Sequence, residues 1–386
     1  MYVQKIIFGS PGTGKSYAIV DIAKNRLEIE FQETAKILSN TVKTVFHPEY
    51  NYFDFMGKLL PLTNGGSVIY KYYPGDFLKA LGIAYKNLLE NVNSSNCLLV
   101  IDELNRGNAA AIFGSVFQLL DRNDDGWSTY ELDISDMELV ALFNVMGHKA
   151  NVNNDFSVQV DGSRLEFFIK QLVDKYSSDT GKTALIKLLE QRKIKIPPNL
   201  SIIATINTSD ESIYYLDSAF KRRWDWQHYP SPNYKSKFTV PPIVKEANLI
   251  LPNDLTKPWY KYILGINEFI KSYHQDIRRI EDKQIGWWFI KPINGQVTLE
   301  QVKDKLMFYL WDSVFARNKQ LLIKYIEDEL DKNHGDIVTF SDFLLYTEDL
   351  LEQWSSSLKQ KTLEQNELFD EFSDIEVSNT EDSHEF

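Results

Sequence analysis

KIIFGSPGTGKS, at residues 5–16, is the stretch from which the architecture of the chain is most readily predicted. Its apolar start, KIIF, predicts a short buried strand, and the apolar-periodic residues 15–31 predict a helix. The loop between them fits the pattern G-x-x-x-x-G-K-[ST], which binds nucleotide phosphates when it joins a strand to a helix. We therefore expect a phosphate-binding loop at residues 9–16; the alternative is a chance glycine-rich turn.

This loop predicts roles for its own residues. Glycines let backbone N–H groups surround a β-phosphate, and the start of the following helix favours negative charge. Lys15 is expected to reach the β- and γ-phosphates, and the Ser16 hydroxyl to bind Mg²⁺. The residues predicted to bind the nucleotide are Gly9, Pro11, Gly12, Thr13, Gly14, Lys15, Ser16 and Tyr17.

A second apolar run, CLLVI at residues 97–101, ends in Asp102 and Glu103. It predicts a buried strand with two carboxylates at its carboxyl end. Downstream of a phosphate-binding loop, Asp102 is expected to hold Mg²⁺ through water. Glu103 is expected to be the general base that polarises the attacking water. Without the loop, the same pattern would indicate only a solvated strand end.

A third apolar strand is predicted at residues 200–206, LSIIATI, and Asn207 ends it. In a parallel sheet the carboxyl ends of the strands gather at one edge, where ligands bind. Asn207, with Asp210 shortly after it, is therefore expected to orient the attacking water beside the γ-phosphate. The alternative is a polar turn that caps the next helix.

Three basic residues close the helix predicted after this strand: Lys221, Arg222 and Arg223. Cations at the end of a helix ordinarily complement its dipole. Because they follow the three motifs above, however, Arg222 or Arg223 is a candidate arginine finger. Such a residue completes the active site of a neighbouring subunit.

Strands that alternate with helices over residues 1–230 predict an α/β fold, in which helices flank a parallel sheet. An insertion is expected near residues 132–192. After a proline-rich linker, residues 231–360 are expected to form a helical lid domain, with helices at 260–281, 299–331 and 340–358. Residues 361–386 are predicted to be a disordered acidic tail, because all nine charged side chains after position 363 are carboxylates.

The composition excludes several classes of protein. With 386 residues, 43% of them hydrophobic, and a net charge of −12, the chain can bury a large core, which excludes global disorder. Its one cysteine, Cys97, excludes an intramolecular disulfide, and its six scattered histidines lack zinc-ligand spacing. Apolar runs reach about five residues, whereas a membrane-spanning helix needs about 20. We expect a soluble, cytoplasmic protein.

In this order, the motifs resemble those of the AAA+ ATPases and, more narrowly, of the McrB-type GTPase subunit of modified-cytosine restriction systems. Residues 102–108, DELNRGN, with IFG at 112–114, are similar to the family's D-E-I-N-R-A-N and I-F-G. Residues 198–210, PNLSIIATINTSD, are similar to its P-x-N-L-Y-I-I-G-T-M-N-T-A-D. The similarity extends to FHPEYNYFDF at 46–55 and QIGWWF at 284–289.

The resemblance implies roles and partners. It implies GTP as the preferred substrate, a hexameric ring, a McrC-like nuclease partner, and translocation along DNA in anti-phage defence. The implied roles are nucleotide and Mg²⁺ binding by Lys15, Ser16 and Asp102, water activation by Glu103, water positioning by Asn207 and Asp210, and action in trans by Arg222 or Arg223.

The chain departs from the family pattern at four places. Glu211 stands where the family usually has Arg, and Trp287-Trp288 replace His-Ser in the lid motif. The insertion contains a helical stretch at 164–192 that could face a partner or DNA; a surface helical pair is the alternative. Because the phosphate-binding loop begins at residue 9, we expect DNA recognition to come from another chain.

Other functions fit the same motifs. One is an ATP-driven, MoxR-like chaperone that remodels a protein client. Another is a nucleotide-switched scaffold, against which the intact Glu103 and Asn207 count. The choice between GTP and ATP stays open, and the basic clusters at 192–195 and 221–223 are too sparse to indicate a DNA groove. Finally, we expect core packing rather than base stacking for the aromatic side chains of Tyr70, Tyr72, Tyr73, Phe77, Trp287 and Trp288.

Overall fold

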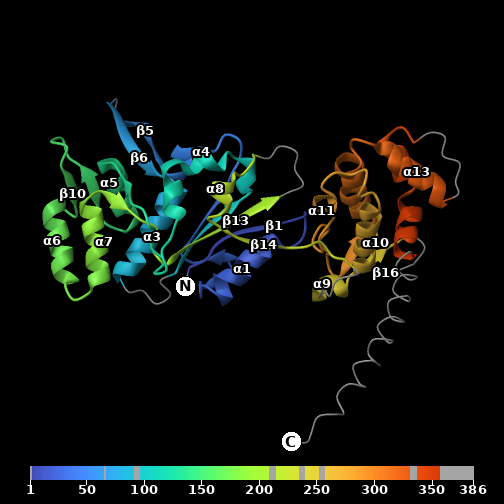
Figure 1. Cartoon of the computed structure of the whole chain (residues 1–386), viewed down its shortest axis with the longest axis horizontal. Coiled ribbons are helices and arrows are strands. Elements are labelled where there is room, and N and C mark those ends of the chain that lie inside the picture. The colour runs from blue at the N-terminus through green and yellow to red at the C-terminus, as the bar shows by residue number, and fades with distance from the viewer. Residues whose placement is uncertain are drawn as a thin grey trace, which may run out of the picture. The chain divides into compact units, whose positions relative to one another are not determined.

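The computed structural model describes residues 2–64, 67–90, 96–207, 214–233, 240–251, 257–330 and 337–356. The chain divides into two compact units (Figure 1). The first contains Met1–Phe8 and Lys15–His228, and the second contains Gly9–Gly14 and Tyr229–Phe386. The predicted phosphate-binding loop thus groups with the second unit, although the strand before it and the helix after it belong to the first.

A five-stranded sheet forms the centre of the first unit, with its strands in the order β14-β1-β13-β7-β4. β1 pairs parallel with β14, and β7 pairs parallel with both β13 and β4. All residues of β13 except its last are buried, as expected of a central strand that is covered on both faces. The predicted α/β fold is therefore confirmed. Its strands are β1 (Gln4–Gly9), β4 (Thr41–Val45), β7 (Cys97–Asp102), β13 (Leu200–Asn207) and β14 (Asp225–His228).

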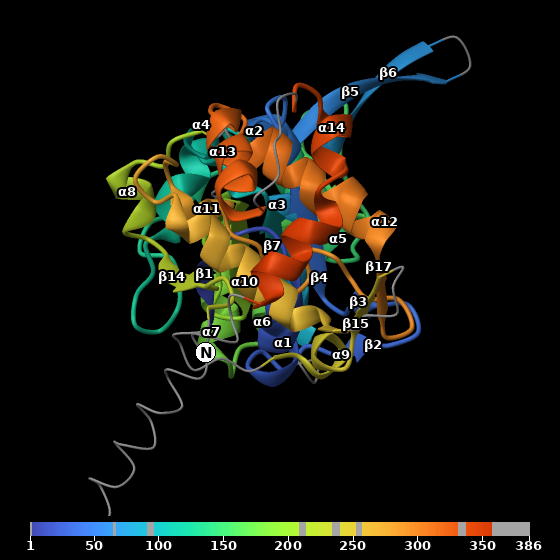
Figure 2. The same cartoon turned by 90° about the vertical axis from the view of Figure 1, so that its right-hand side faces the viewer.

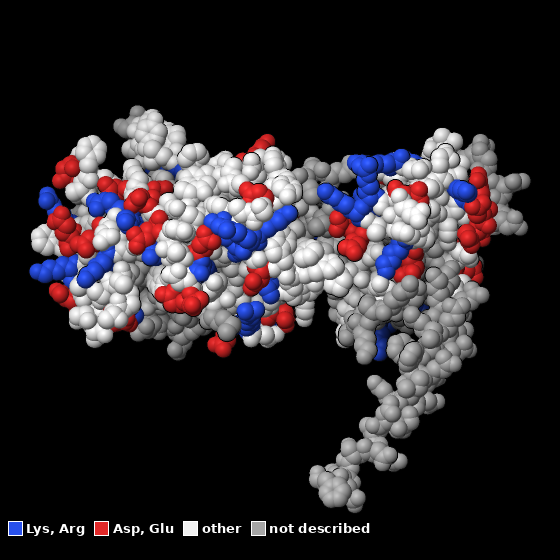
Figure 3. Space-filling view, in the orientation of Figure 1, with Lys and Arg blue, Asp and Glu red and all other residues white. Residues whose placement is uncertain are grey.

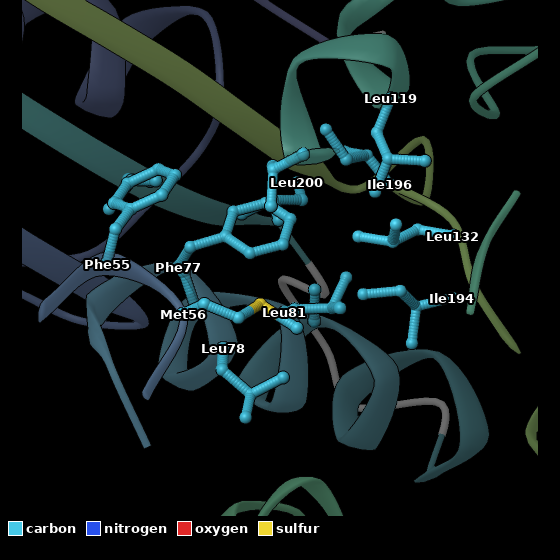
Figure 4. Packing of buried hydrophobic residues seen from close by; sticks show 14 of the residues in the cluster. Phe55, Met56, Phe77, Leu78, Leu81, Leu119, Leu132, Ile194, Ile196 and Leu200 are labelled. Carbon is cyan, nitrogen blue, oxygen red and sulfur yellow. The ribbon is translucent and has the colours of Figure 1, made fainter. Parts of the chain in front are cut away.

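Helices cover this sheet. α3 (Asp76–Glu90) contacts β4, β7 and β13, and its Phe77 and Leu81 pack close to Leu200 of β13 (Figure 4). Residues 109–120 form two elements rather than one helix, because Gly114 has a φ of +47° where they meet. The other elements of this part are α1 (Lys15–Asn25), β2 (Phe31–Gln32), β3 (Ile37–Leu38), α4 (Ala109–Phe113), α8 (Ser218–Lys221) and the 3-10 helices η1 (Leu104–Arg106) and η2 (Gly114–Leu120).

A β-hairpin projects from the first unit between α2 (Tyr52–Phe55) and α3 (Figure 2). Its strands, β5 (Gly57–Asn64) and β6 (Ser67–Pro74), pair antiparallel over their whole length. Phe77 is buried and Tyr72 half-buried, but Tyr70 is 64% and Tyr73 is 37% exposed. The expectation of core packing is therefore wrong for Tyr70 and Tyr73. Aromatic side chains pack into a core only where another layer covers them, and the outer part of a projecting hairpin lacks such a layer.

The insertion near residues 132–192 extends the core of the first unit. Its helical stretch forms α6 (Leu165–Lys175) and α7 (Thr180–Glu190), which pack against each other. A further helix, α5 (Asp136–Val145), contacts α3 and buries Leu142 and Phe143 in the same hydrophobic cluster. The insertion also contains the short strands β8 (Leu132–Asp133), β9 (Ala150–Val152), β10 (Val158–Val160) and β11 (Ser163–Arg164), and β12 (Lys193–Ile194) follows it.

Helices make up most of the second unit, around a core that includes Trp259, Tyr262 and Trp354. The single helix predicted at 299–331 is divided in two by a turn at 315–318, and its first part, 299–314, contains two π-helical segments. The acidic tail lies outside the described residues. None of the helices in the described ranges has the length and apolar composition that crossing a membrane requires. The elements are α9 (Pro242–Lys245), β15 (Asn248–Ile250), β16 (Lys257–Pro258), α10 (Trp259–Ser272), α11 (Ile280–Lys283), β17 (Gln296–Thr298), α12 (Leu299–Gln301), η3 (Val302–Met307), η4 (Leu310–Val314), α13 (Lys319–Leu330) and α14 (Phe340–Leu344).

Candidate nucleotide-binding and catalytic site

The loop from Gly9 to Gly14 joins β1 to α1, as the sequence predicts. Gly12 and Gly14 have φ values of +76° and +91°, in the region that favours glycine. A Cβ atom on Gly12 would also lie only 2.4 Å from the backbone nitrogen of Phe289, within the second unit. Glycine is therefore required at position 12 for two reasons: the backbone conformation of the loop, and the lack of room for a side chain beside Phe289.

Hydroxyl groups brace this loop. Thr13 Oγ1 donates to the carbonyl oxygen of Ser10 at 3.0 Å, and Ser10 Oγ donates to the carbonyl oxygen of Glu281 at 2.5 Å. Ser231 Oγ in turn donates to Ser10 Oγ at 2.8 Å. The side chain of Thr13, which the sequence places among the nucleotide-binding residues, thus stabilises the shape of the loop.

Helix α1 begins at Lys15, so the residues directly after the loop lie at a helix N-terminus. Backbone N–H groups at this end of a helix attract phosphate. Lys15 is half-buried, Ser16 is exposed, and the side chain of Tyr17 is 76% exposed. The hydroxyl of Ser16 is therefore accessible to a metal ion. Because the ring of Tyr17 points into solvent, this residue is suited to bind a nucleotide phosphate through its backbone N–H and not through its ring.

Asp102 ends β7 and is held from the two neighbouring strands. Thr205 on β13 donates from its hydroxyl to Asp102 Oδ1 at 3.0 Å. Lys43 on β4 places its Nζ 2.7 Å from Asp102 Oδ2. Thr205 is only 5% exposed, so it orients the carboxylate from inside the sheet. The sequence does not indicate either partner, because only the strand register brings them to Asp102.

Glu103 has a φ of +56°, which is uncommon for a residue other than glycine. Asn207 Nδ2 donates to Glu103 Oε1, and Arg106 Nε lies 3.4 Å from Glu103 Oε2. The backbone N–H of Glu103 donates to Thr205 Oγ1 at 3.3 Å, so Thr205 contacts both acidic residues. The left-handed backbone and these contacts hold the carboxylate in one orientation, as a general base requires.

The structure thus brings together three of the predicted site residues, Asp102, Glu103 and Asn207, at the ends of β7 and β13. β1, which leads into the phosphate-binding loop, is the next strand beside β13. Asp210 lies outside the described residues, as does Glu211. Arg106, which contacts Glu103, was not among the predicted site residues. Its position in the DELNRGN motif was the only feature of the sequence that could have indicated a role in the site.

The two candidate arginine fingers after α8 differ in environment. Arg222 is exposed. The side chain of Arg223 is only 9% exposed, its Nη2 lies 2.6 Å from Asp121 Oδ2, and its guanidinium lies 4.0 Å from the centre of the Phe117 ring. A cation held in this way inside its own subunit is poorly placed to reach a neighbour. Arg222 is therefore the better candidate for the arginine finger.

Replacement of Arg223 with alanine is expected to lower the free energy of unfolding by about 3 kcal/mol, because it leaves Asp121 without its buried partner. Urea unfolding would measure the difference. Arg222→Ala, at an exposed position, is the matched control and should change the free energy by less than about 0.5 kcal/mol. Equal effects of the two substitutions would contradict the structural role of Arg223.

The other basic cluster is ion-paired. Lys193 and Lys195 lie 3.0 and 3.4 Å from the carboxylate of Glu131, and Arg192 Nε lies 2.6 Å from Asp136 Oδ1. Basic and acidic side chains are interspersed on the face of the first unit shown in Figure 3. Because the cations near 192–195 have acidic partners, they do not form a basic stripe of the kind that binds DNA.

A parallel sheet, a phosphate-binding loop after β1 and an acidic pair at the end of β7 define the class: the chain has an α/β core with a loop of the P-loop type between β1 and α1. No family model matches it. One similar protein is described as "Type II restriction enzyme BsuMI component YdiS" of Bacillus subtilis. It is 27% identical over 344 residues, which cover 81% of this chain and 80% of that protein.

A solved structure from Cytophaga hutchinsonii, provisionally described as an ATPase, also matches this chain. Its sequence identity is 13%, its TM-score is 0.25, and the match covers 58% of this chain and 41% of that one. A TM-score of this size is too low to support a statement about fold or function.

Proposed function

We propose that this protein is a nucleoside-triphosphate hydrolase, the AAA+ motor subunit of a DNA restriction complex. The observation that carries the proposal is the arrangement of Asp102 and Glu103. Each carboxylate is oriented by β13, through Thr205 and Asn207 respectively. A scaffold that only binds nucleotide needs no oriented base, whereas hydrolysis does.

Ser16 and Asp102 would hold Mg²⁺. Both supply hard oxygen donors of the kind that Mg²⁺ prefers. The ammonium group of Lys43, 2.7 Å from Asp102 Oδ2, supports the fit because a cation already lies against this carboxylate. When bound, the metal would neutralise charge on the β- and γ-phosphates. Lys15 would bind the same phosphates from the helix N-terminus.

Glu103 would accept a proton from the attacking water while the water oxygen bonds to the γ-phosphorus and the bond to the β–γ bridging oxygen breaks. Asn207 would keep the carboxylate in position and orient the water. Arg222 of a neighbouring subunit would stabilise the charge that develops on the transferred group. This arrangement makes each active site depend on an adjacent copy of the chain.

The similarity to a Bacillus subtilis restriction-enzyme component supports placing this hydrolase in a restriction system with several subunits. We propose a McrBC-like division of labour, supported by the DELNRGN and QIGWWF motifs. This chain would form a hexameric ring, prefer GTP and drive translocation along DNA, and a separate McrC-like subunit would carry the nuclease.

The test is phosphate release from GTP and from ATP, measured in parallel with Glu103→Gln as the blank. We expect turnover of GTP at a rate well above that of ATP. Turnover of ATP alone would overturn the GTP preference and make a MoxR-like remodelling function equally well supported. Absence of turnover with both nucleotides, despite nucleotide binding, would overturn the hydrolase in favour of a nucleotide-switched scaffold.

A further inference from the structure

The 3-10 helix η1, which directly follows the acidic pair, contacts the carboxyl end of β13 in the first unit. The ladder between β13 and β7 ends at the pair of Ala204 with Ile101, before β13 reaches Asn207. Beyond that pair, η1 replaces β7 as the neighbour of β13. The residues of η1 can therefore determine where Asn207 lies.

Asn105, in the middle of η1, binds the main chain at two points. Its Nδ2 atom donates to the carbonyl oxygen of Asn207 at 2.8 Å. Its own carbonyl oxygen accepts from the backbone N–H of Tyr214 at 2.7 Å. Asn105 thus anchors the chain both where β13 ends and at Tyr214, which is the next described residue.

The same turn also binds the side chain of Asn207. Asn207 Nδ2 donates to Glu103 Oε1, and the backbone N–H of Arg106 donates to the carbonyl oxygen of Glu103 at 2.9 Å, which closes the turn. Glu103 therefore holds the amide of Asn207, while Asn105 holds its carbonyl oxygen. A bond to the side chain alone would leave the main chain of Asn207 free to shift, and the second bond removes that freedom.

The environment of Asn105 indicates what its side chain contributes. A carbonyl oxygen accepts hydrogen bonds and cannot donate them, so the amide nitrogen of Asn105 must face Asn207. Asn105 is 3% exposed, and its Oδ1 atom has no hydrogen-bond donor among the described residues. A buried acceptor without a donor is destabilising, and an apolar side chain of similar volume would avoid that cost. The donor to Asn207 is thus the property for which the fold needs asparagine here.

We propose that Asn105 is a positioning residue for hydrolysis, which keeps the amide of Asn207 against Glu103 and the attacking water. This inference rests on the proposed function, because it requires Glu103 to act as the base. Asn105 itself contacts neither the nucleotide nor the water, and its effect reaches the reaction through Asn207. A displacement of about 1 Å in a group that orients a reactant can lower the rate about 100-fold.

The experiment compares Asn105→Leu with Asn199→Leu. Asn199 is also buried in the first unit, and its Nδ2 atom donates to the carbonyl oxygen of Ala84 at 3.0 Å. Asn199 directly precedes β13 and Asn207 ends it, so the two bonds lie at opposite ends of one strand. Each substitution removes one buried hydrogen bond from an amide to a carbonyl oxygen, so the two variants are matched in structural cost.

Turnover distinguishes the two variants. At a temperature where both are folded, Asn105→Leu should lower phosphate release at saturating nucleotide about 10–100-fold and leave nucleotide affinity within about twofold. Asn199→Leu should change neither quantity by more than about twofold. Equal losses of turnover in the two variants would mean that Asn105 only stabilises the fold, which would overturn the proposal.

A second arm removes the side chain on which Asn105 acts. Asn207→Ala loses the amide but keeps the carbonyl oxygen that Asn105 binds. In this background, Asn105→Leu should lower the residual single-turnover rate by less than about twofold, because no amide is left to position. A further loss as large as in the unaltered protein would contradict action through Asn207. If Asn105→Leu does not fold, Asn105→Ala, which also removes the donor, takes its place in both arms.

Glu103→Gln separates the inference from the proposed function. If Glu103→Gln lowers turnover but Asn105→Leu behaves like Asn199→Leu, Glu103 is the base and the role of Asn105 is wrong. If the unaltered protein releases no more phosphate than Glu103→Gln does, the proposed function itself is wrong, and this inference is wrong with it.

Discussion

Replacement of Arg222 with alanine is expected to lower the rate of nucleotide hydrolysis about 10³–10⁵-fold while the protein remains folded. Arg222 is exposed directly after α8, whereas Arg223 is paired with Asp121 inside its own subunit. The loss is large because an arginine finger stabilises charge that develops only in the transition state. Steady-state phosphate release at saturating nucleotide measures it.

A mixing experiment tests whether Arg222 acts in trans. Arg222→Ala retains Glu103, and Glu103→Gln retains Arg222, so a mixed ring contains some sites with both groups. We therefore expect two inactive variants to regain activity when mixed. The activity of the unaltered protein should also rise faster than linearly with concentration unless the ring is already assembled. No recovery on mixing, or strictly linear activity from a proven monomer, would refute the finger in trans.

Replacement of Glu103 with glutamine is expected to lower turnover about 10²–10⁴-fold and to leave nucleotide affinity almost unchanged. Glutamine fills the same space but cannot accept the proton of the attacking water. Asn207 donates to Glu103 Oε1, and glutamine still offers an oxygen there, so the local structure should be preserved. Phosphate release measures turnover, and titration with a fluorescent nucleotide measures affinity.

Glu131→Gln is the matched control for this substitution. Glu131 pairs with Lys193 and Lys195 on the surface of the first unit, and no contact among the described residues links it to the acidic pair at the end of β7. It should therefore leave both turnover and affinity unchanged. If Glu103→Gln loses nucleotide binding instead, the carboxylate has a structural role and is not the base.

Several features of the fold and site could be predicted because they depend on residues close together in the chain. The glycine pattern at residues 9–16 dictates a tight loop wherever it occurs between a strand and a helix. The apolar runs before Asp102 and Asn207 each predict a buried strand with a polar end. Their alternation with helices predicts a parallel sheet, and the carboxyl ends of such strands then meet at one edge.

Other features could not be predicted because they depend on partners distant in the chain. Arg222 and Arg223 are neighbours of the same type, and only the position of Asp121 distinguishes them. The exposure of Tyr70 depends on what covers the hairpin, which the sequence of the hairpin does not reveal.

The local patterns of the sequence were thus enough to indicate the phosphate-binding loop, the acidic pair and the class of fold, because contiguous residues set backbone conformation and strand ends. The pairing of Lys43 and Thr205 with Asp102, and the hydrogen bond from Asn105 to Asn207, came only from the folded chain. Hydrogen bonds and ion pairs require atoms within about 3 Å of each other. For residues that are far apart in the chain, strand register and packing bring the atoms together.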